Sequence, residues 1–290
     1  MSTVPSAGRE SPPTAVTGLR IPDRTLSLLR DLVYARTGIH YDEQRITFMR
    51  DRLAPLAIER GFDSLLDYYY LLKYDANAEE DWGRAIDALS VQETYFWREF
   101  DQVQSLTTTI LPQLVALKRS PIRIWSVPCA TGEEPLSIAM ALNEAGWFNR
   151  AAIEIHASDV SPAALKRAAA RTYGRRAFRQ LPERLRDKYF TANGEQWTIV
   201  PEIYSRITSW TQINLSNAQE LFPLGQSDVV FCRNVFIYFD EAGIRRVVDR
   251  LADLMPSPGF LCVGAAESLL RLTTRFDLRD IAGAYVYVKP

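Results

Sequence analysis

Side chains that commonly bind transition metals are scarce in this chain of 290 residues, which has two histidines and three cysteines. Cys129, Cys232 and Cys262 are far apart, form no CxxC pair and lie on or beside apolar runs. We interpret them as reduced core residues of an intracellular protein. With only His40 and His156 available besides, we expect no metal site.

Neither sign of charge is in excess, and long apolar runs are missing as well. The chain has 34 basic and 35 acidic residues, so it lacks the basic character typical of proteins that bind nucleic acid. No apolar run reaches the ~20 residues that cross a bilayer, and the N-terminus lacks the apolar core of a secretion signal. We therefore expect a soluble cytoplasmic protein that neither binds nucleic acid nor inserts into a membrane.

The first third of the chain is helical in pattern. Residues 1–18 are rich in Ser, Thr, Pro and Gly, which predicts a disordered leader. In residues 19–90 apolar side chains recur at spacings of three and four, so we expect an all-helical subdomain. Residues 91–120 form a linker and a connecting helix, in which Pro112 predicts a kink or break.

Residues 121–290 alternate between short apolar strands and helices. The strands are predicted at residues 122–127, 153–158, 228–232, 260–264 and 285–288, and two of the helices at 162–170 and 241–254. This alternation is typical of an α/β domain with a mainly parallel sheet and helices on both faces. Ligands of such sheets bind beyond the carboxyl ends of the strands.

Residues 179–210 interrupt the alternation. They contain a charged helix, an Asn193-Gly194 turn and two runs with the pattern of strands, the second from Ile203 to Trp210. We interpret this segment as an inserted antiparallel ribbon. Such an insertion serves either as a docking surface or as a structural part, and the sequence leaves both open.

The stretch SVPCATGEEPLS, residues 126–137, leads from the first strand into a helix. Its turn contains one glycine, Gly132, and the helix opens with Glu133 and Glu134. A phosphate site needs several glycines and bare amide donors, and two acids would repel a phosphate. A ribose or a cationic sulfonium tolerates acids. The stretch therefore indicates S-adenosylmethionine rather than NAD or ATP.

Other polar residues stand at strand ends and at the domain junction. Asp159 ends the second strand 27 residues after Gly132, where an acid often binds ribose, although it could instead cap the next helix. Arg233 and Asn234 follow an apolar strand, and burying either without a partner would cost a few kcal/mol, so each should have a partner or a ligand. Tyr238 is either a core aromatic or a hydrogen-bond donor.

The segment QETYFWR, residues 92–98, joins the helical subdomain to the sheet domain. Ligand sites favour such junctions. The aromatic residues of the segment are explained by packing. Arg98 is not, because it must face solvent, pair with an acid or receive a carboxylate.

Together these segments resemble the chemoreceptor glutamate methyltransferases of the CheR family. Residues 92–98 are similar to the family's Asn-x-Thr-x-Phe-Phe-Arg, and residues 130–137 to Ser-Thr-Gly-Glu-Glu-Pro-Tyr-Ser. Asn214-Leu215, the run FCRNVFIYF at 231–239 and Gly264-x-x-Glu-Ser268 follow in family order. This chain departs from the pattern by Gln92, Trp97 and the lead-in Val127-Pro128-Cys129.

The resemblance implies a Rossmann-like S-adenosylmethionine domain of the α/β class, with an N-terminal helical subdomain and an inserted antiparallel β-subdomain at about 179–210. It assigns the cofactor contacts to Gln92, Thr94, Arg98, Glu133, Asp159, Asn214, Leu215, Asn234 and Val235. Arg98 and Tyr238 become the active-site pair. We expect Glu133 to contact the cationic methionine end of the cofactor and Glu134 merely to begin the helix.

The activity that the resemblance implies is methylation of glutamate side chains on the cytoplasmic helices of a methyl-accepting chemoreceptor, for sensory adaptation. S-adenosylmethionine becomes S-adenosylhomocysteine without a metal, the β-subdomain can dock the receptor's C-terminal peptide, and we expect a monomer. Two alternatives remain. One is a methyltransferase for a small molecule, which the sheet domain alone would permit, and the other is a cofactor-binding sensor without turnover, which would need a lost active-site group.

Overall fold

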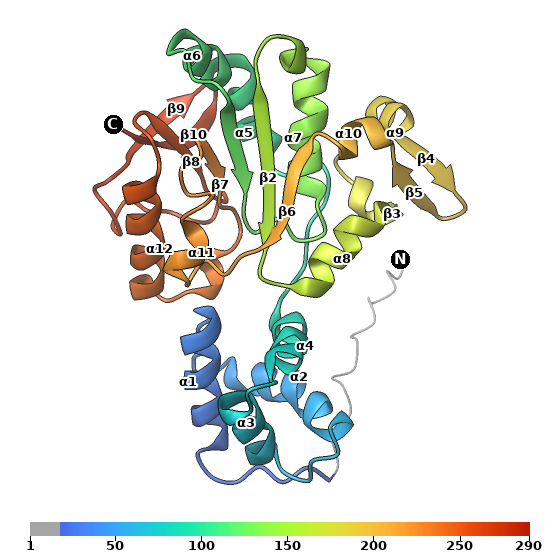
Figure 1. Cartoon of the computed structure of the whole chain (residues 1–290), viewed down its shortest axis with the longest axis vertical. Helices are drawn as coiled ribbons and strands as arrows, with labels where there is room; N and C mark the ends of the chain where they lie inside the picture. The colour runs from blue at the N-terminus through green and yellow to red at the C-terminus, as the bar shows by residue number, and fades with distance from the viewer. Residues whose placement is uncertain (1–17) are drawn as a thin grey trace, which may run out of the picture.

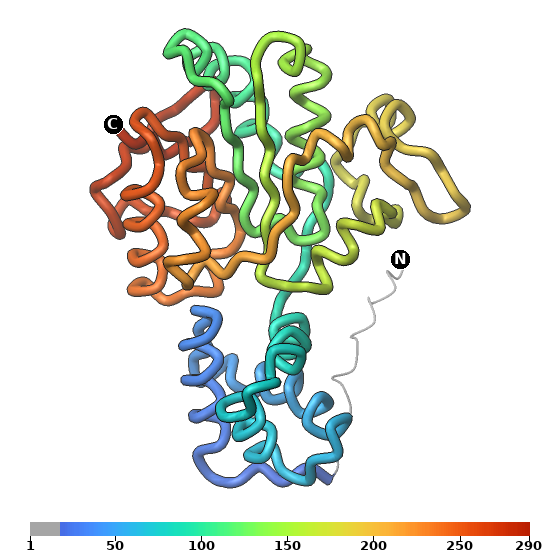
Figure 2. The backbone as a smooth tube through the Cα atoms, in the orientation of Figure 1, coloured from blue at the N-terminus to red at the C-terminus, as the bar shows by residue number. Residues whose placement is uncertain are grey.

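The computed structural model describes residues 18–290, so the leader predicted for residues 1–18 lies outside the described residues except for Gly18. Figure 1 shows a small helical domain below a larger α/β domain, with the arrows of the central strands pointing toward the helical domain. The backbone crosses between the two domains once, after the fourth helix (Figure 2). The carboxyl ends of the strands therefore face the domain junction.

The helical domain consists of α1 (Thr25–Thr37), α2 (Ile46–Glu59), α3 (Leu65–Tyr74) and α4 (Glu79–Leu89). It has its own core, in which Leu29, Leu53 and Tyr68 are fully buried. Gly38 ends α1 in the left-handed region at φ 75°, where glycine has no steric penalty. The predicted all-helical subdomain is confirmed.

The connecting helix begins at Phe100 and includes a wider turn. It comprises α5 (Phe100–Ser105), the π-helical η1 (Leu106–Ile110) and α6 (Leu111–Ala116). In a regular helix the ring of Pro112 would clash with the carbonyl oxygen four residues earlier. The π-turn immediately before Pro112 makes room for that ring, so the irregularity predicted at this proline takes the form of a π-turn.

The large sheet has seven strands in the order β6-β2-β1-β7-β8-β10-β9. Their bounds are β1 (Ile122–Ser126), β2 (Ile153–Asp159), β6 (Ile207–Gln212), β7 (Val229–Phe231), β8 (Gly259–Cys262), β9 (Asp277–Ile281) and β10 (Ala284–Lys289). The first five strands in the order are parallel, whereas β10 is antiparallel to β8 and β9. The chain leaves β1 toward β2 and later returns to its other side as β7. This reversal of strand order creates a crevice at the carboxyl ends of β1 and β7.

Helices and short turns fill both faces of the sheet. Their bounds are α7 (Glu133–Glu144), η2 (Trp147–Asn149), α8 (Pro162–Ala170), α11 (Ala218–Leu221), η4 (Phe236–Tyr238) and α12 (Glu241–Leu254). One apolar core packs α5 and α7 against the sheet, and a second packs α12 against the other face. The predicted Rossmann-like α/β class is confirmed.

The inserted subdomain is a three-stranded antiparallel sheet with the order β3-β5-β4, and it projects from one side of the molecule (Figure 2). It comprises β3 (Thr172–Gly174), η3 (Arg175–Phe178), α9 (Glu183–Tyr189), β4 (Phe190–Asn193), β5 (Gln196–Ile199) and α10 (Pro201–Tyr204). Asn193 and Gly194 form the turn of the β4–β5 hairpin. An antiparallel insertion is thus present, although its first strand begins before residue 179.

The assignment of Ile203 to Trp210 to this ribbon is wrong. The strand in that region, β6, pairs in parallel with β2 in the main sheet and forms its edge. An edge strand is partly solvated, and only one of the six residues of β6 is buried, so its mixed polar and apolar pattern is the same as that of a ribbon strand.

Candidate active site

A cavity lies at the domain junction, beyond the carboxyl ends of β1, β2 and β7. Thr37, Ile39 and Leu89 line it from the helical domain. The sheet domain contributes the glycine turn, the end of β2 and the loop after β7. Every site residue predicted from the sequence lines this cavity except Glu133: Gln92, Thr94, Arg98, Asp159, Asn214, Leu215, Asn234, Val235 and Tyr238.

The glycine turn is held against the end of β2. Gly132 has φ 97°, and a Cβ there would lie 2.9 Å from the ring of Trp210, so only glycine fits. Asp159 accepts hydrogen bonds from the backbone amides of Ala130 at 2.8 Å and Ser161 at 2.9 Å. Burial raises the pKa of the Asp159 carboxyl. The cap of α8 is Ser161, which accepts from the Ala164 amide, so Asp159 does not have the capping role that the sequence left open.

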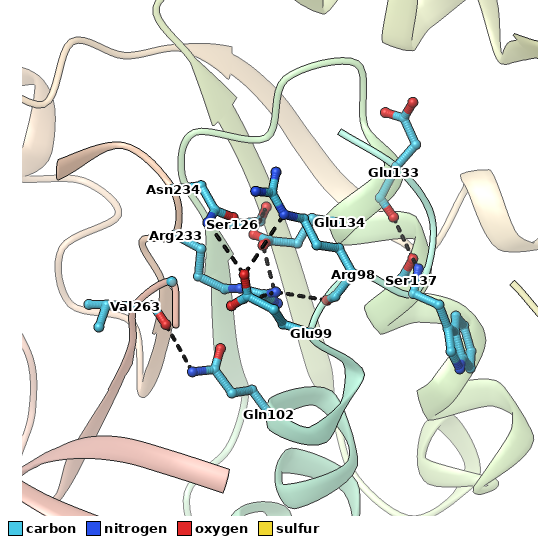
Figure 3. A network of polar contacts seen from close by, with 12 residues as sticks. Arg98, Glu99, Gln102, Ser126, Glu133, Glu134, Ser137, Arg233, Asn234 and Val263 are labelled. Carbon is cyan, nitrogen blue, oxygen red and sulfur yellow. Dashed lines mark hydrogen bonds and ion pairs between the residues drawn. The ribbon is translucent and has the colours of Figure 1, made fainter. Parts of the chain in front are cut away.

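The two glutamates at the start of α7 point in different directions (Figure 3). Glu134 lines the cavity, accepts from the Ser126 hydroxyl at 2.7 Å and lies 3.5 Å from Arg233. Glu133 is buried outside the cavity lining, where it accepts from the Thr131 hydroxyl at 2.6 Å. Successive helical residues project about 100° apart, so the two side chains leave the helix in different directions. The cavity lining includes Glu134, which was expected only to begin the helix, and not Glu133, whose contact with the cofactor stays a prediction.

Arg233 is the centre of a buried ion network, drawn in Figure 3. Its side chain is 1% exposed, and its guanidinium lies 3.3 Å from Glu99 and 3.5 Å from Glu134. Nη2 also donates to the backbone carbonyl of Arg98 at 2.7 Å. Burial raises the pKa of the Glu134 carboxyl, while the neighbouring Arg233 charge opposes the rise. The partner that the sequence required for Arg233 is therefore this pair of acids.

The loop after β7 is held by the buried carboxylate of Glu267. This carboxylate accepts from the backbone amides of Asn234, Phe236 and Gly264 at 2.7, 2.7 and 2.8 Å. Asn234 has φ 57°, and a Cβ on Gly264 would lie 2.5 Å from its side-chain nitrogen. The Gly-x-x-Glu spacing at 264–267 thus fixes the backbone that carries Asn234 and Val235 into the cavity wall.

Arg98 and Tyr238 line the same cavity from different segments. Arg98 donates to the carbonyl of Glu93 at 2.9 Å, and its side chain is 29% exposed. Tyr238 is half-buried at the end of η4, and burial raises the pKa of its hydroxyl. The helical domain reaches this tyrosine directly, because the His40 amide donates to the Tyr238 carbonyl at 2.8 Å and the Arg45 guanidinium lies 5.8 Å from its ring centroid.

Two of the predicted cofactor contacts already have protein partners for their side-chain amides. Gln92 donates to the Ser161 hydroxyl at 2.7 Å and accepts from Arg167. Asn214 donates to the Arg36 carbonyl at 2.6 Å, and its oxygen accepts from the Ser216 amide. Asn214 therefore joins the two domains beside the cavity.

The sequence identified most of the cavity residues but not the acids that surround Arg233. Glu99 and Glu134 could have been suspected, because a buried arginine needs carboxylates and both lie beside predicted site segments. In residues 18–290 no group of three or more His, Cys, Asp or Glu side chains is arranged to hold a metal ion. No helix in this described part is long and apolar enough to cross a membrane. The three cysteines are free and buried, as predicted.

The parallel sheet, the single-glycine turn and the acid at the end of β2 define the class of S-adenosylmethionine-dependent α/β methyltransferases. Within that class the chain belongs to the CheR methyltransferase family. The family model described as the CheR methyltransferase SAM binding domain matches residues 92–284, and the model of the CheR all-alpha domain matches residues 24–90.

Curated relatives resemble the chain over most of its length. It is 34% identical over 274 residues to chemotaxis protein methyltransferase 2 of Vibrio cholerae, covering 93% of this chain and 94% of that protein. It is 32% identical over 259 residues to the chemotaxis protein methyltransferase of Borreliella burgdorferi, covering 87% and 90%. A probable biofilm formation methyltransferase, WspC of Pseudomonas putida, is 32% identical over 262 residues, which are 88% of this chain and 59% of that protein.

Proposed function

We propose that this chain transfers a methyl group from S-adenosylmethionine to glutamate side chains of a methyl-accepting chemoreceptor. The products are glutamate methyl esters and S-adenosylhomocysteine. The observation that carries the proposal is the convergence of Arg98 and Tyr238 on the junction cavity, which also contains the acids expected around a cationic cofactor. The names of the curated relatives point to the same substrate class, since several are chemotaxis protein methyltransferases.

The residues of the cavity fit a sulfonium nucleoside. Asp159 has a buried carboxylate suited to ribose hydroxyls, and Glu134 places a second acid on the wall. Because Glu134 is already paired with Arg233, it is the Asp159 carboxylate that would repel a phosphate. The cofactor would be held by Gln92, Thr94, Arg98, Asp159, Asn214, Leu215, Asn234 and Val235, and when bound it supplies an electrophilic methyl group.

The protein's part in the reaction is positioning and exclusion of water. A glutamate is ionised at neutral pH, so its oxygen can attack without a general base. This agrees with the positions of the histidines, since His156 is on β2 with its ring nitrogen 2.8 Å from the Ser209 hydroxyl, and His40 is exposed outside the cavity lining. Arg98 orients the incoming carboxylate and Tyr238 fixes the angle of attack by a hydrogen bond. The helical domain covers the cavity and keeps water out.

The partner is the cytoplasmic part of the receptor, and the enzyme acts in the cytoplasm as a monomer. The β-subdomain suits the receptor's C-terminal peptide, because β4 pairs only with β5 and leaves one edge open for an added strand. The junction cavity with Arg98 and the resemblance to chemotaxis methyltransferases disfavour a small-molecule substrate. Both active-site groups are present, which also disfavours a sensor without turnover.

Transfer of radiolabelled methyl groups from S-adenosylmethionine to receptor cytoplasmic fragments tests the proposal. We expect label that mild base releases, as it does from a methyl ester, and no label on a fragment whose methylation-site glutamates are replaced by glutamine. Label that persists on the glutamine fragment, or no label on either fragment, would refute glutamate methylation.

A further inference from the structure

Two guanidinium groups lie over one aromatic ring beside the cavity. Arg98 from the active site lies 5.5 Å from the centroid of the Tyr95 ring, and Arg179 from the inserted subdomain lies 3.6 Å from the same centroid. Glu93 and Tyr95 both line the cavity. Arg179 therefore lies beside the active site, although it is not one of the site residues predicted from the sequence.

The inserted subdomain is firmly attached at this place. The Phe96 amide donates to the Ala177 carbonyl at 2.8 Å, and the fully buried Phe96 ring packs against Tyr173, Phe178 and Phe190. This cluster joins the segment of Arg98 to the segment of Arg179. The two arginines accordingly belong to one rigid unit.

Arg179 is paired with a carboxylate that is easily displaced. Its Nη2 lies 3.0 Å from the Glu93 carboxylate, and the side chains of Arg179 and Glu93 are 41% and 72% exposed. A pair as exposed as this contributes little to stability. The stacking on Tyr95 would keep the guanidinium oriented if Glu93 moved away. The Arg179 guanidinium is thus preorganised to bind a carboxylate. In the structure Glu93 occupies the position that a carboxylate of the substrate would take.

We propose that Arg179 binds a second acidic side chain of the substrate helix, next to the glutamate that Arg98 receives. This inference rests on the proposed function. The guanidinium carbons of Arg98 and Arg179 both lie near the Tyr95 ring. The distance between these two carbons is therefore at most the sum of their distances to the centre of that ring. Side chains three or four residues apart on a helix have Cβ atoms about 5–6 Å apart, which fits within that limit. The pair therefore selects glutamates that have an acid three or four residues away.

The local charge supports an acidic partner here. Residues 166–206 contain ten basic and four acidic side chains, although the whole chain has a net charge of −1. Arg175 and Arg176, just before Arg179, are both exposed. A helix with several acids would be attracted to this part of the molecule at low salt.

The test compares Arg179→Ala with Arg184→Ala, which removes an equal charge from the same subdomain, where Arg184 is 74% exposed and pairs with Glu144. We expect Arg179→Ala to raise the KM for a receptor fragment about threefold to fivefold, the value of one partly exposed charge pair, and Arg184→Ala to raise it less, because only the general attraction is weakened. The kcat and the KM for S-adenosylmethionine should not change. Arg179→Glu should be rescued by a fragment with lysine in place of the acid three or four residues from the target.

Three results would overturn the inference. Equal KM values for the two alanine variants would show that Arg179 binds no substrate acid. A fall in kcat or a rise in the cofactor KM would show that it only supports Tyr95 and Arg98. Failure of the lysine fragment to rescue Arg179→Glu would show that there is no direct contact. These comparisons use fragments that the unaltered enzyme methylates, whereas absence of methylation by that enzyme would refute the proposed function itself.

Discussion

Arg233 donates a hydrogen bond of 2.7 Å from Nη2 to the backbone carbonyl of Arg98. The residues on either side of Arg98 are in the left-handed region, with φ 69° at Trp97 and φ 45° at Glu99. This conformation is costly for residues with side chains. The buried guanidinium offsets part of that cost and thereby positions Arg98, for which we propose the role of orienting the substrate carboxylate.

Replacement of Arg233 by methionine should destabilise the fold, because it leaves Glu99 and Glu134 without their cation. We expect a loss of about 3–5 kcal/mol in the free energy of unfolding, the usual result of removing one partner of a buried pair. Urea denaturation measures this loss. Adding Glu134→Gln to the methionine variant should restore part of it, and a double variant no more stable than the single one would contradict the network.

Arg98→Ala should abolish receptor methylation while the fold is retained. The side chain is partly exposed and its carbonyl still accepts from Arg233, so the loop has no reason to collapse. Loss of substrate orientation can cost about a hundredfold or more in rate. The rate of methyl transfer measures the loss of activity, and the circular dichroism spectrum shows whether the fold is retained. Near-normal methylation would refute the role of Arg98.

Tyr238→Phe removes one hydroxyl and keeps the ring. We expect kcat to fall about tenfold, which corresponds to one hydrogen bond of roughly 1.4 kcal/mol. Binding of S-adenosylhomocysteine, measured by calorimetry, should stay unchanged. Tyr41→Phe in the helical domain is a suitable control, because Tyr41 is buried outside the cavity lining. Equal kcat values for the two variants would argue against a part for the Tyr238 hydroxyl.

Asp159→Asn should weaken cofactor binding. The carboxylate accepts from two backbone amides, and an asparagine side chain would turn an NH2 group toward one of them. We expect a loss of about 1–3 kcal/mol in the binding of S-adenosylhomocysteine, since the ribose hydroxyls lose a charged acceptor. Calorimetric titration measures it. An unchanged affinity would place Asp159 outside the cofactor site.

Activity should fall on the acid side at a pH above the ordinary carboxyl value. Burial raises the pKa of Glu134 from its usual 4.5. As the pH decreases through this raised pKa, Glu134 gains a proton and its ion pair with Arg233 is lost. The pH dependence of S-adenosylhomocysteine affinity tests this, with Glu134→Gln as the comparison. The variant should keep only the part of the acid limb that comes from Asp159, whose pKa burial also raises, and identical profiles would show that Glu134 does not titrate in the site.

Much of the fold was predictable because periodicity is a local property. Spacings of three and four residues identified the helical domain, and short apolar runs identified β1, β2, β7, β8 and β10 within one to two residues at each end. The place of β6 was not predictable. Its residues have the same alternation in an edge strand as in a ribbon, and only pairing with β2 distinguishes the two.

The sequence by itself determined which segments meet at the site, because the motifs lie at strand ends and parallel strands bring those ends to one edge. Only the tertiary structure decided which side chains face the cavity. Glu134 lines the cavity and bonds to Ser126, whereas Glu133 bonds to Thr131 outside the lining. The contacts of Arg233 with Arg98 and of Arg179 with Glu93 join residues far apart in the chain, so no local sequence pattern could predict them.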